Sequence, residues 1–149
     1  MKETIIADST CLIGLERINH LHILQKLYDN VIIPPEVEKE SGILKDWIKV
    51  EQPHNSLLVY SLKLILDSGE AEAIALACMK GKRIILDDKQ ARNVARRMKL
   101  NVIGTVGMLL QAKNSGIIKA VKPLIEELER NSFYIGEPLK REALKIAKE

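Results

Sequence analysis

Five acidic side chains occupy positions where a metal ion could gather them. Asp8 directly follows one short apolar run, and Asp87 and Asp88 directly follow another. Glu70 begins an alanine-rich segment, and Glu40 lies near the end of a segment led by two prolines. Carboxylates brought close together raise one another's pKa and resist ionisation unless a cation neutralises them. The five positions therefore form a candidate metal-binding set.

The ligand types favour hard cations. Carboxylate oxygens without a His or Cys partner suit Mg²⁺ or Mn²⁺. The three histidines, His20, His22 and His54, lie outside the predicted strand ends, so Zn²⁺ is disfavoured. A bound divalent ion lowers the pKa of its water and stabilises in-line displacement at phosphorus. The set therefore points to hydrolysis of a phosphodiester.

Basic residues beside the acids suit such a substrate. Lys89, Arg92 and Arg96 are spaced i, i+3 and i+7, so they share one face of a predicted helix and could contact phosphate. Ser9 and Thr105, just past two strand ends, could orient water or phosphate. Each of these residues also has an ordinary structural interpretation, as a helix cap or as part of a solvated helix face.

The elements that must position these side chains alternate along the chain. The pattern predicts strands at 4–7, 31–33, 47–51, 83–86, 101–103 and 133–135, the third at a sheet edge. It predicts one helix that starts at residue 9 or 10, and further helices over 20–28, 36–40, 56–66, 70–80, 89–99, 104–112, 121–130 and 139–148. Gly69 separates the helix at 56–66 from the helix at 70–80. Strands separated by helices predict an α/β/α sandwich with a mainly parallel central sheet. Ligands bind such sheets at the carboxyl ends of the strands, where the acids lie.

Composition bounds the alternatives. The 149 residues suit one domain, and 46% hydrophobic with only 3% aromatic residues predicts an aliphatic core. The net charge of +3 is weak support for a polyanionic partner. Cys11 and Cys78 lie in apolar stretches and are expected to be buried thiols of a reducing compartment. With no apparent signal peptide or membrane span, we expect a cytoplasmic protein. Glycine-rich dinucleotide and P-loop motifs are absent from the sequence.

The motifs together resemble PIN domains. The segments that carry the likeness are Ile5–Thr10, Ile33–Glu40, Gly69–Ala77, Ile85–Asp88 and Gly104–Leu109, over about the first 120 residues. The sequence is most similar to small prokaryotic VapC-like ribonucleases, and within them to a subgroup described as nucleic-acid-binding proteins. Residues 121–149 lie outside the matching motifs and are expected to form a helical extension of the same single domain.

The resemblance implies roles for four of the acids. Asp8, Glu40, Glu70 and Asp88 match the positions that hold one or two Mg²⁺ or Mn²⁺ ions for cleavage of single-stranded or looped RNA. Glu70 stands where the family more often has Asp, and Glu72 is its rival, because residues two apart on a helix face different sides. The resemblance also implies frequent homodimers and, in many members, an antitoxin partner.

Three interpretations remain open at this stage. The first is a metal-dependent endoribonuclease, with Asp87 as an extra ligand or an outward-facing neighbour. The second is a PIN-like nucleic-acid- or protein-binding module without catalysis, which the Glu at position 70 makes credible. The third is an unrelated α/β interaction protein.

Overall fold

The strands form one parallel sheet. The computed structural model describes residues 3–149, and the sheet order is β3-β2-β1-β4-β5. The strands are β1 (Thr4–Ala7), β2 (Asn30–Ile33), β3 (Ile48–Val50), β4 (Arg83–Ile85) and β5 (Val102–Ile103). Ile6 of the central strand β1 is in register with Ile32 of β2 and with Ile84 of β4. Every neighbouring pair is parallel, so the carboxyl ends of all five strands lie at one edge.

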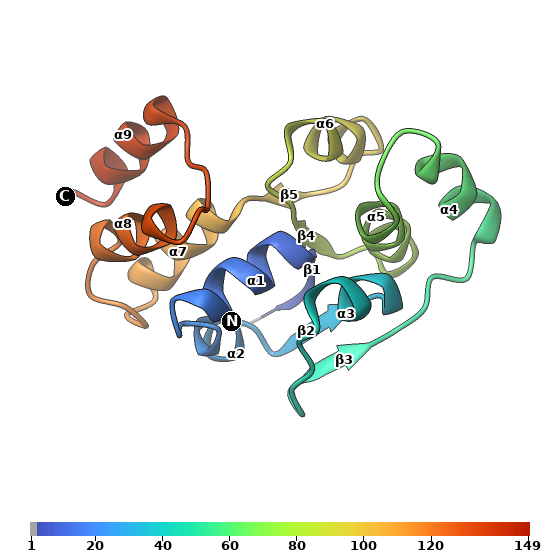
Figure 1. Cartoon of the computed structure of the whole chain (residues 1–149), viewed down its shortest axis with the longest axis horizontal. Helices are drawn as coiled ribbons and strands as arrows, with labels where there is room; N and C mark the ends of the chain where they lie inside the picture. The colour runs from blue at the N-terminus through green and yellow to red at the C-terminus, as the bar shows by residue number, and fades with distance from the viewer. Residues whose placement is uncertain (1–2) are drawn as a thin grey trace.

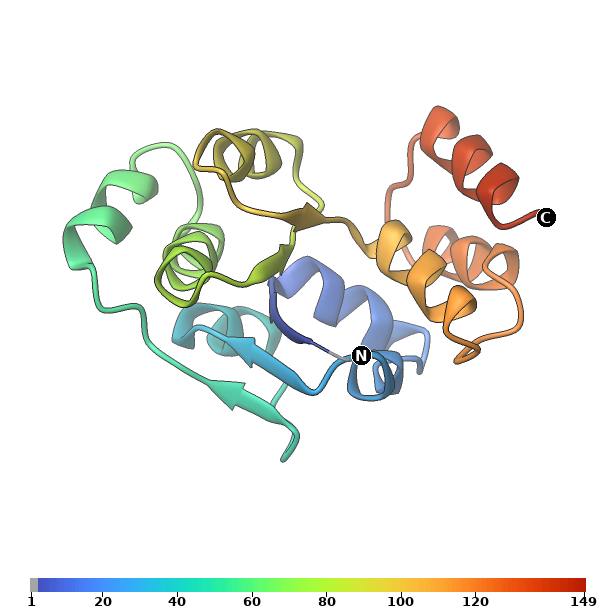
Figure 2. The same ribbon diagram turned by 180° about the vertical axis from the view of Figure 1, so that it is seen from behind.

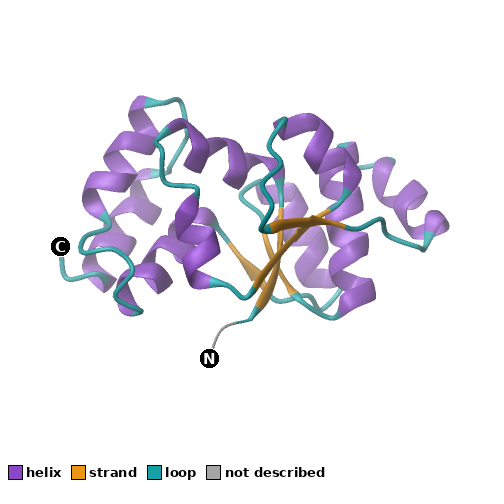
Figure 3. Ribbon diagram, turned by 90° about the horizontal axis from the view of Figure 1, so that it is seen from below, coloured by secondary structure: helices purple, strands orange, loops and turns teal. Residues whose placement is uncertain are grey.

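Helices cover both sides of this sheet (Figure 3). They are α1 (Ser9–Arg17), α2 (His22–Leu27), α3 (Pro35–Ser41), α4 (Ser56–Lys63), α5 (Ser68–Lys80), α6 (Lys89–Arg97), α7 (Thr105–Asn114), α8 (Lys122–Arg130) and α9 (Glu137–Ile146). Helices α7, α8 and α9 gather at one end of the molecule, and α4 lies at the other (Figures 1 and 2). The predicted α/β/α sandwich is confirmed. Within residues 3–149, no helix combines the length and apolar character that crossing a membrane requires.

The core is aliphatic, as the composition predicts. Ile5, Ile6 and Ala7 of β1 are fully buried, which is expected for a central parallel strand covered on both faces. Ile74 and Leu76 of α5 are also fully buried against this sheet. Both cysteines are free, and Cys11 is buried whereas Cys78 is only partly so.

The first turn of α5 differs from the prediction. Gly69 was expected to separate two helices, but α5 begins at Ser68 and includes Gly69 in its first turn. Asp67 caps this helix, since its side chain accepts a hydrogen bond from the Glu70 amide. The glycine is therefore a packing position rather than a helix stop.

The predicted strand at 133–135 is wrong. These residues connect α8 to α9 as an extended segment without strand pairing. Phe133 packs on Gly14 of α1, and Ile135 is buried, while Tyr134 between them is exposed. The predicted alternation of buried and exposed side chains is present. The segment packs against α1, however, and does not pair with an edge strand of the sheet.

Candidate metal centre

Asp8 is the most buried acid of the site. It follows the last residue of β1 at the N-cap position of α1, yet its side chain makes no capping hydrogen bond. Only 3% of the residue is exposed, and its Oδ1 atom has no hydrogen-bond partner among residues 3–149. Burial raises the pKa of Asp8 to about 8, although a hydrogen bond from the Ser9 amide opposes this change. The negative charges of Glu70, Asp67 and Glu40 raise it further.

Glu40 reaches this site from the last turn of α3. This helix begins with Pro35 at its first position, where a missing N–H costs nothing. The Glu40 carboxylate lies over Gly69, in the space that a larger residue there would fill. The Ser9 hydroxyl donates a hydrogen bond to Glu40 Oε1 at 3.4 Å. Partial burial, followed by the charge of Asp67, raises the pKa of Glu40.

The start of α5 contributes a second pair of acids. The Glu70 amide donates to Asp67 Oδ1 at 2.8 Å, and the Asp67 amide donates to Glu70 Oε1 at 3.4 Å, which completes a capping box. Desolvation raises the pKa of Glu70 to about 7, and the charges of Asp67 and Asp88 add to this effect. Sequence analysis missed Asp67, although the Asp-x-x-Glu spacing is a recognisable capping signal.

Glu72, the rival of Glu70, points elsewhere. Its Oε1 atom accepts a hydrogen bond from the Glu36 amide at 3.1 Å, in the first turn of α3. Glu72 therefore links α5 to α3, while the charge of Glu70 raises the pKa of Asp8.

The two aspartates after β4 also diverge. Asp88 is exposed and caps α6 by accepting a hydrogen bond from the Ala91 amide at 2.9 Å. Its charge acts on Glu70. Asp87 is instead held by Thr105: its Oδ1 accepts from the Thr105 amide at 2.9 Å, and its Oδ2 accepts from the Thr105 hydroxyl at 2.6 Å. Burial raises the pKa of Asp87, and these two hydrogen bonds lower it.

The predicted substrate-binding residues fall into two groups. Lys89, Arg92 and Arg96 line one hollow of about 540 Å³ between α6, β5 and the start of α7, so the helical spacing does place them together. Arg92 also donates a hydrogen bond to the Leu86 carbonyl at 2.9 Å. Thr105, by contrast, is fully buried, and its hydroxyl is committed to Asp87.

Comparison with known proteins identifies the family. Residues 4–149 match a family profile described as the PIN domain. The chain belongs to the PIN-domain family. PIN domains are typically nucleases. The matched residues of this PIN domain extend through α8 and α9, beyond the motifs near the acids.

A solved structure resembles this PIN domain, with a TM-score of 0.49 and 21% sequence identity. It is a PilT N-terminus domain protein from the hyperthermophilic archaeon Sulfolobus solfataricus, and the match covers 71% of this chain and 90% of that one. No curated protein matches the chain.

The donor set of this PIN domain suits a divalent cation. Within residues 3–149, no three His, Cys, Asp or Glu side chains are already grouped closely enough to hold a metal ion. The buried, unpartnered Oδ1 of Asp8 and the raised pKa values of Glu40 and Glu70 are nevertheless the conditions that a cation relieves. Hard oxygen ligands of this kind fit Mg²⁺ or Mn²⁺.

Proposed function

We propose that this PIN domain is a metal-dependent endoribonuclease that hydrolyses phosphodiester bonds in single-stranded or looped RNA. The observation that carries the proposal is Asp8, a buried carboxylate with an unpartnered oxygen at the end of the central strand. The charges of Glu70, Asp67 and Glu40 raise the pKa of Asp8, and the charge of Asp88 raises the pKa of Glu70, which supports a site shared by acids from four separate segments. Without a cation, this arrangement is electrostatically unfavourable.

The proposed ligands are Asp8, Glu40, Glu70 and Asp88, to which we add Asp67. Asp67 belongs with them because its charge raises the pKa of Asp8, Glu40 and Glu70 alike. The chemistry supplied by a bound Mg²⁺ or Mn²⁺ is a water of lowered pKa and stabilisation of negative charge on the phosphoryl oxygens.

The remaining roles belong to the protein's own side chains. Lys89, Arg92 and Arg96 would contact the phosphates of the RNA backbone and hold the RNA along α6. The Ser9 hydroxyl orients Glu40. Asp87 and Thr105 join the end of β4 to the start of α7 and so fix the spacing of the strand ends. We leave these two residues out of the proposed ligands and RNA contacts because their polar atoms are already paired.

The proposal extends to regulation of the toxin–antitoxin kind. An antitoxin and a second copy of the chain are the proposed protein partners, as in small VapC-like members of the family. Leu57 and Tyr60 on α4 and Leu64 at its C-cap are exposed and provide apolar surface for such contacts. The cytoplasm is the proposed location, because RNA substrates and reduced thiols at Cys11 and Cys78 occur together there.

The test is cleavage of an unstructured, labelled RNA with and without Mn²⁺. We expect Mn²⁺ to activate cleavage and Asp8→Asn to lower the rate at least about a hundredfold, since this change removes the central charged ligand. Asp46→Asn is the matched control, because Asp46 is an exposed acid in the loop before β3. Circular dichroism would confirm that both variants are folded.

Two outcomes would favour a binding module without catalysis. One is cleavage that survives Asp8→Asn at the wild-type rate. The other is RNA binding by the wild-type protein without any cleavage in Mn²⁺ or Mg²⁺.

A further inference from the structure

Two surface hollows meet at the segment between α8 and α9. One hollow, of about 440 Å³, is lined by Thr10 and Arg17 of α1 and by Asp88. The other, of about 540 Å³, is the basic hollow along α6. Phe133 and Tyr134 line both of them. We call the proposed ligands Asp8, Glu40, Asp67, Glu70 and Asp88 the acidic edge. Since Asp88 lines the first hollow, a strand of nucleic acid running from the acidic edge to the basic hollow would pass this aromatic pair.

The segment is fixed in place by its neighbours. A Cβ atom on Gly14 would lie 2.7 Å from Phe133 Cδ2, so the ring packs on α1 at a position that has no side chain. The Phe133 amide donates a hydrogen bond to the Leu128 carbonyl at 2.9 Å, and Ile135 is only 6% exposed. Tyr134 is thus presented by two anchored neighbours, one on each side.

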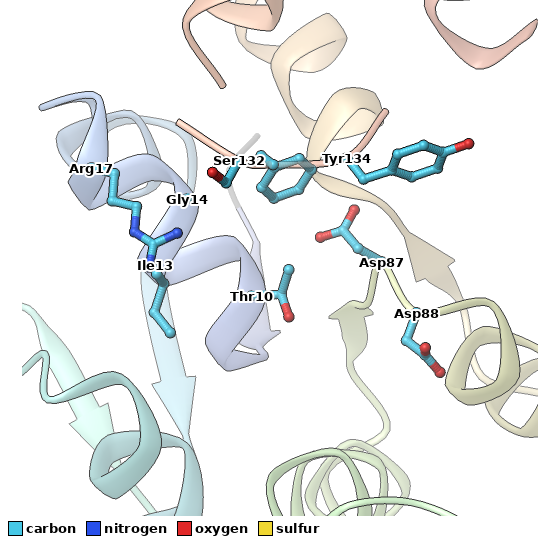
Figure 4. Close-up of a pocket in the computed structure, with 9 residues that line it drawn as sticks. Thr10, Ile13, Gly14, Arg17, Asp87, Asp88, Ser132 and Tyr134 are labelled. Atoms are coloured by element: carbon cyan, nitrogen blue, oxygen red, sulfur yellow. The ribbon is translucent and has the colours of Figure 1, made fainter. Parts of the chain in front are cut away.

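Tyr134 itself is 89% exposed. In Figure 4 its ring projects away from the segment, above Asp87 and Asp88 and across from Thr10. The chain has only three Tyr, one Phe and one Trp, and Tyr134 is more exposed than Tyr60, the other exposed tyrosine. Proteins that hold single-stranded nucleic acids combine a basic groove with aromatic rings on which bases stack.

Charge complements the aromatic surface. Lys89 and Arg96 are exposed beside Tyr134, and Arg92 is half-buried in the same hollow. These cations could bind the phosphates of an RNA strand while one of its bases stacks on the Tyr134 ring. A base inside a duplex is already stacked on both faces, so the pair of features fits unpaired RNA.

We propose that Tyr134 is a base-stacking subsite for single-stranded RNA, placed between the acidic edge and the basic hollow. It rests on the proposed function only in taking RNA as the ligand. The C-terminal helices α8 and α9 thereby gain a role, because they hold the segment that carries the ring.

The test measures binding of a fluorescein-labelled, unstructured RNA by anisotropy. The full chain is used in EDTA, where no metal-dependent cleavage can occur. The variants are Tyr134→Ala, Tyr134→Trp and the control Leu44→Ala, which removes an exposed apolar side chain from the loop before β3. Competition by inorganic polyphosphate reports binding of phosphate without bases.

We expect Tyr134→Ala to weaken RNA binding about 5- to 150-fold, the range of one lost stacking contact. Tyr134→Trp and the control Leu44→Ala should keep the wild-type RNA affinity. Polyphosphate should bind the Tyr134→Ala protein as well as it binds the wild type. An unchanged RNA affinity in Tyr134→Ala would overturn the subsite. An equal loss of RNA and polyphosphate binding would also overturn it, as would a Tyr134→Trp protein as weak as Tyr134→Ala.

The result separates this inference from the nuclease proposal. A protein that cleaves no RNA but shows the Tyr134 effect keeps the subsite and loses the nuclease. Cleavage that depends on Mn²⁺ and Asp8, without any Tyr134 effect on binding, keeps the nuclease and removes the subsite.

Discussion

The carboxylate of Glu40 lies in the space that a Cβ atom on Gly69 would occupy. Gly69 is buried in the first turn of α5, and Glu40 comes from the end of α3. A glycine inside a helix costs about 1 kcal/mol of stability relative to alanine. The fold accepts this cost and in return holds an acid against the start of α5, next to Asp8.

Gly69→Ala should therefore separate stability from activity. The new methyl group would displace the flexible end of Glu40, and we expect RNA cleavage to fall at least about tenfold because a ligand is misplaced. The free energy of unfolding should be unchanged or about 1 kcal/mol higher. Cleavage assays and urea unfolding measure the two effects.

A double-mutant cycle supplies the control for this prediction. In a Glu40→Ala background, Gly69→Ala should have no further effect on cleavage, because the side chain that it displaces is gone. An equal loss in both backgrounds would show that Gly69 acts through something other than Glu40.

Asp67 has two separable roles, as a helix cap and as a charge in the site. Asn caps helices about as well as Asp, so Asp67→Asn should leave stability nearly unchanged but weaken Mn²⁺ binding. Asp67→Ala should also lose about 1 kcal/mol of stability with the cap. Thermal unfolding measures the capping role of Asp67, and Mn²⁺ titration measures its role in metal binding. Equal Mn²⁺ affinity in Asp67→Asn and the wild type would restrict Asp67 to capping.

Asp87 and Asp88 should respond differently to substitution. Asp87→Ala leaves the buried Thr105 amide unpaired, and we expect the free energy of unfolding to fall by about 2 kcal/mol. Asp88→Asn keeps the cap of α6 and should lower cleavage with little change in stability. Unfolding and cleavage measured on both variants check this. Full stability with no cleavage in Asp87→Ala would instead indicate a direct role for Asp87 in the site.

The buried Asp8 should make the metal-free protein less stable as the pH rises. Its pKa is about 8 in the folded protein against 3.8 ordinarily, so the folded state holds a proton that the unfolded chain has released. The contribution of Asp8 is therefore fully present below about pH 4 and is lost as the pH rises through about 8. Glu70, with a pKa of about 7, acts in the same direction.

Comparison with Asp8→Asn isolates this effect, because all other titrating groups are shared. In EDTA at pH 8, the Asp8→Asn protein should be more stable than the wild type by roughly 1 to 3 kcal/mol, since no charge is buried. At pH 5 the difference should shrink. Thermal melts at both pH values measure this difference in stability. A difference that is the same at pH 5 and pH 8 would contradict the raised pKa of Asp8.

Much of this fold follows from local patterns in the sequence. The apolar runs that became β1, β2 and β4 are short and fully buried, which is the signature of a parallel sheet. Residues 133–135 show where such patterns fail, because alternation records which side chains are buried and not what covers them. Phe133 is covered by Gly14, more than a hundred residues earlier in the chain.

The site was harder to predict in detail than the fold. Asp87 and Asp88 are neighbours that point to different partners, and only the position of Thr105 reveals which one is paired. Asp67 was missed because it precedes the glycine taken as a helix break. Glu70 and Glu72 differ in their surroundings. The charges of Asp67 and Asp88 act on Glu70, whereas Glu72 accepts a hydrogen bond from the Glu36 amide at the start of α3.

Calorimetric titration of Mn²⁺ into the metal-free protein tests the central claim most directly. The account predicts heat and saturable binding of one or two ions by the wild-type protein, and loss of that binding in Asp8→Asn but not in Asp46→Asn. An absence of binding heat in the wild type, or equal affinity in Asp8→Asn, would contradict the assignment of this acidic edge as a metal centre.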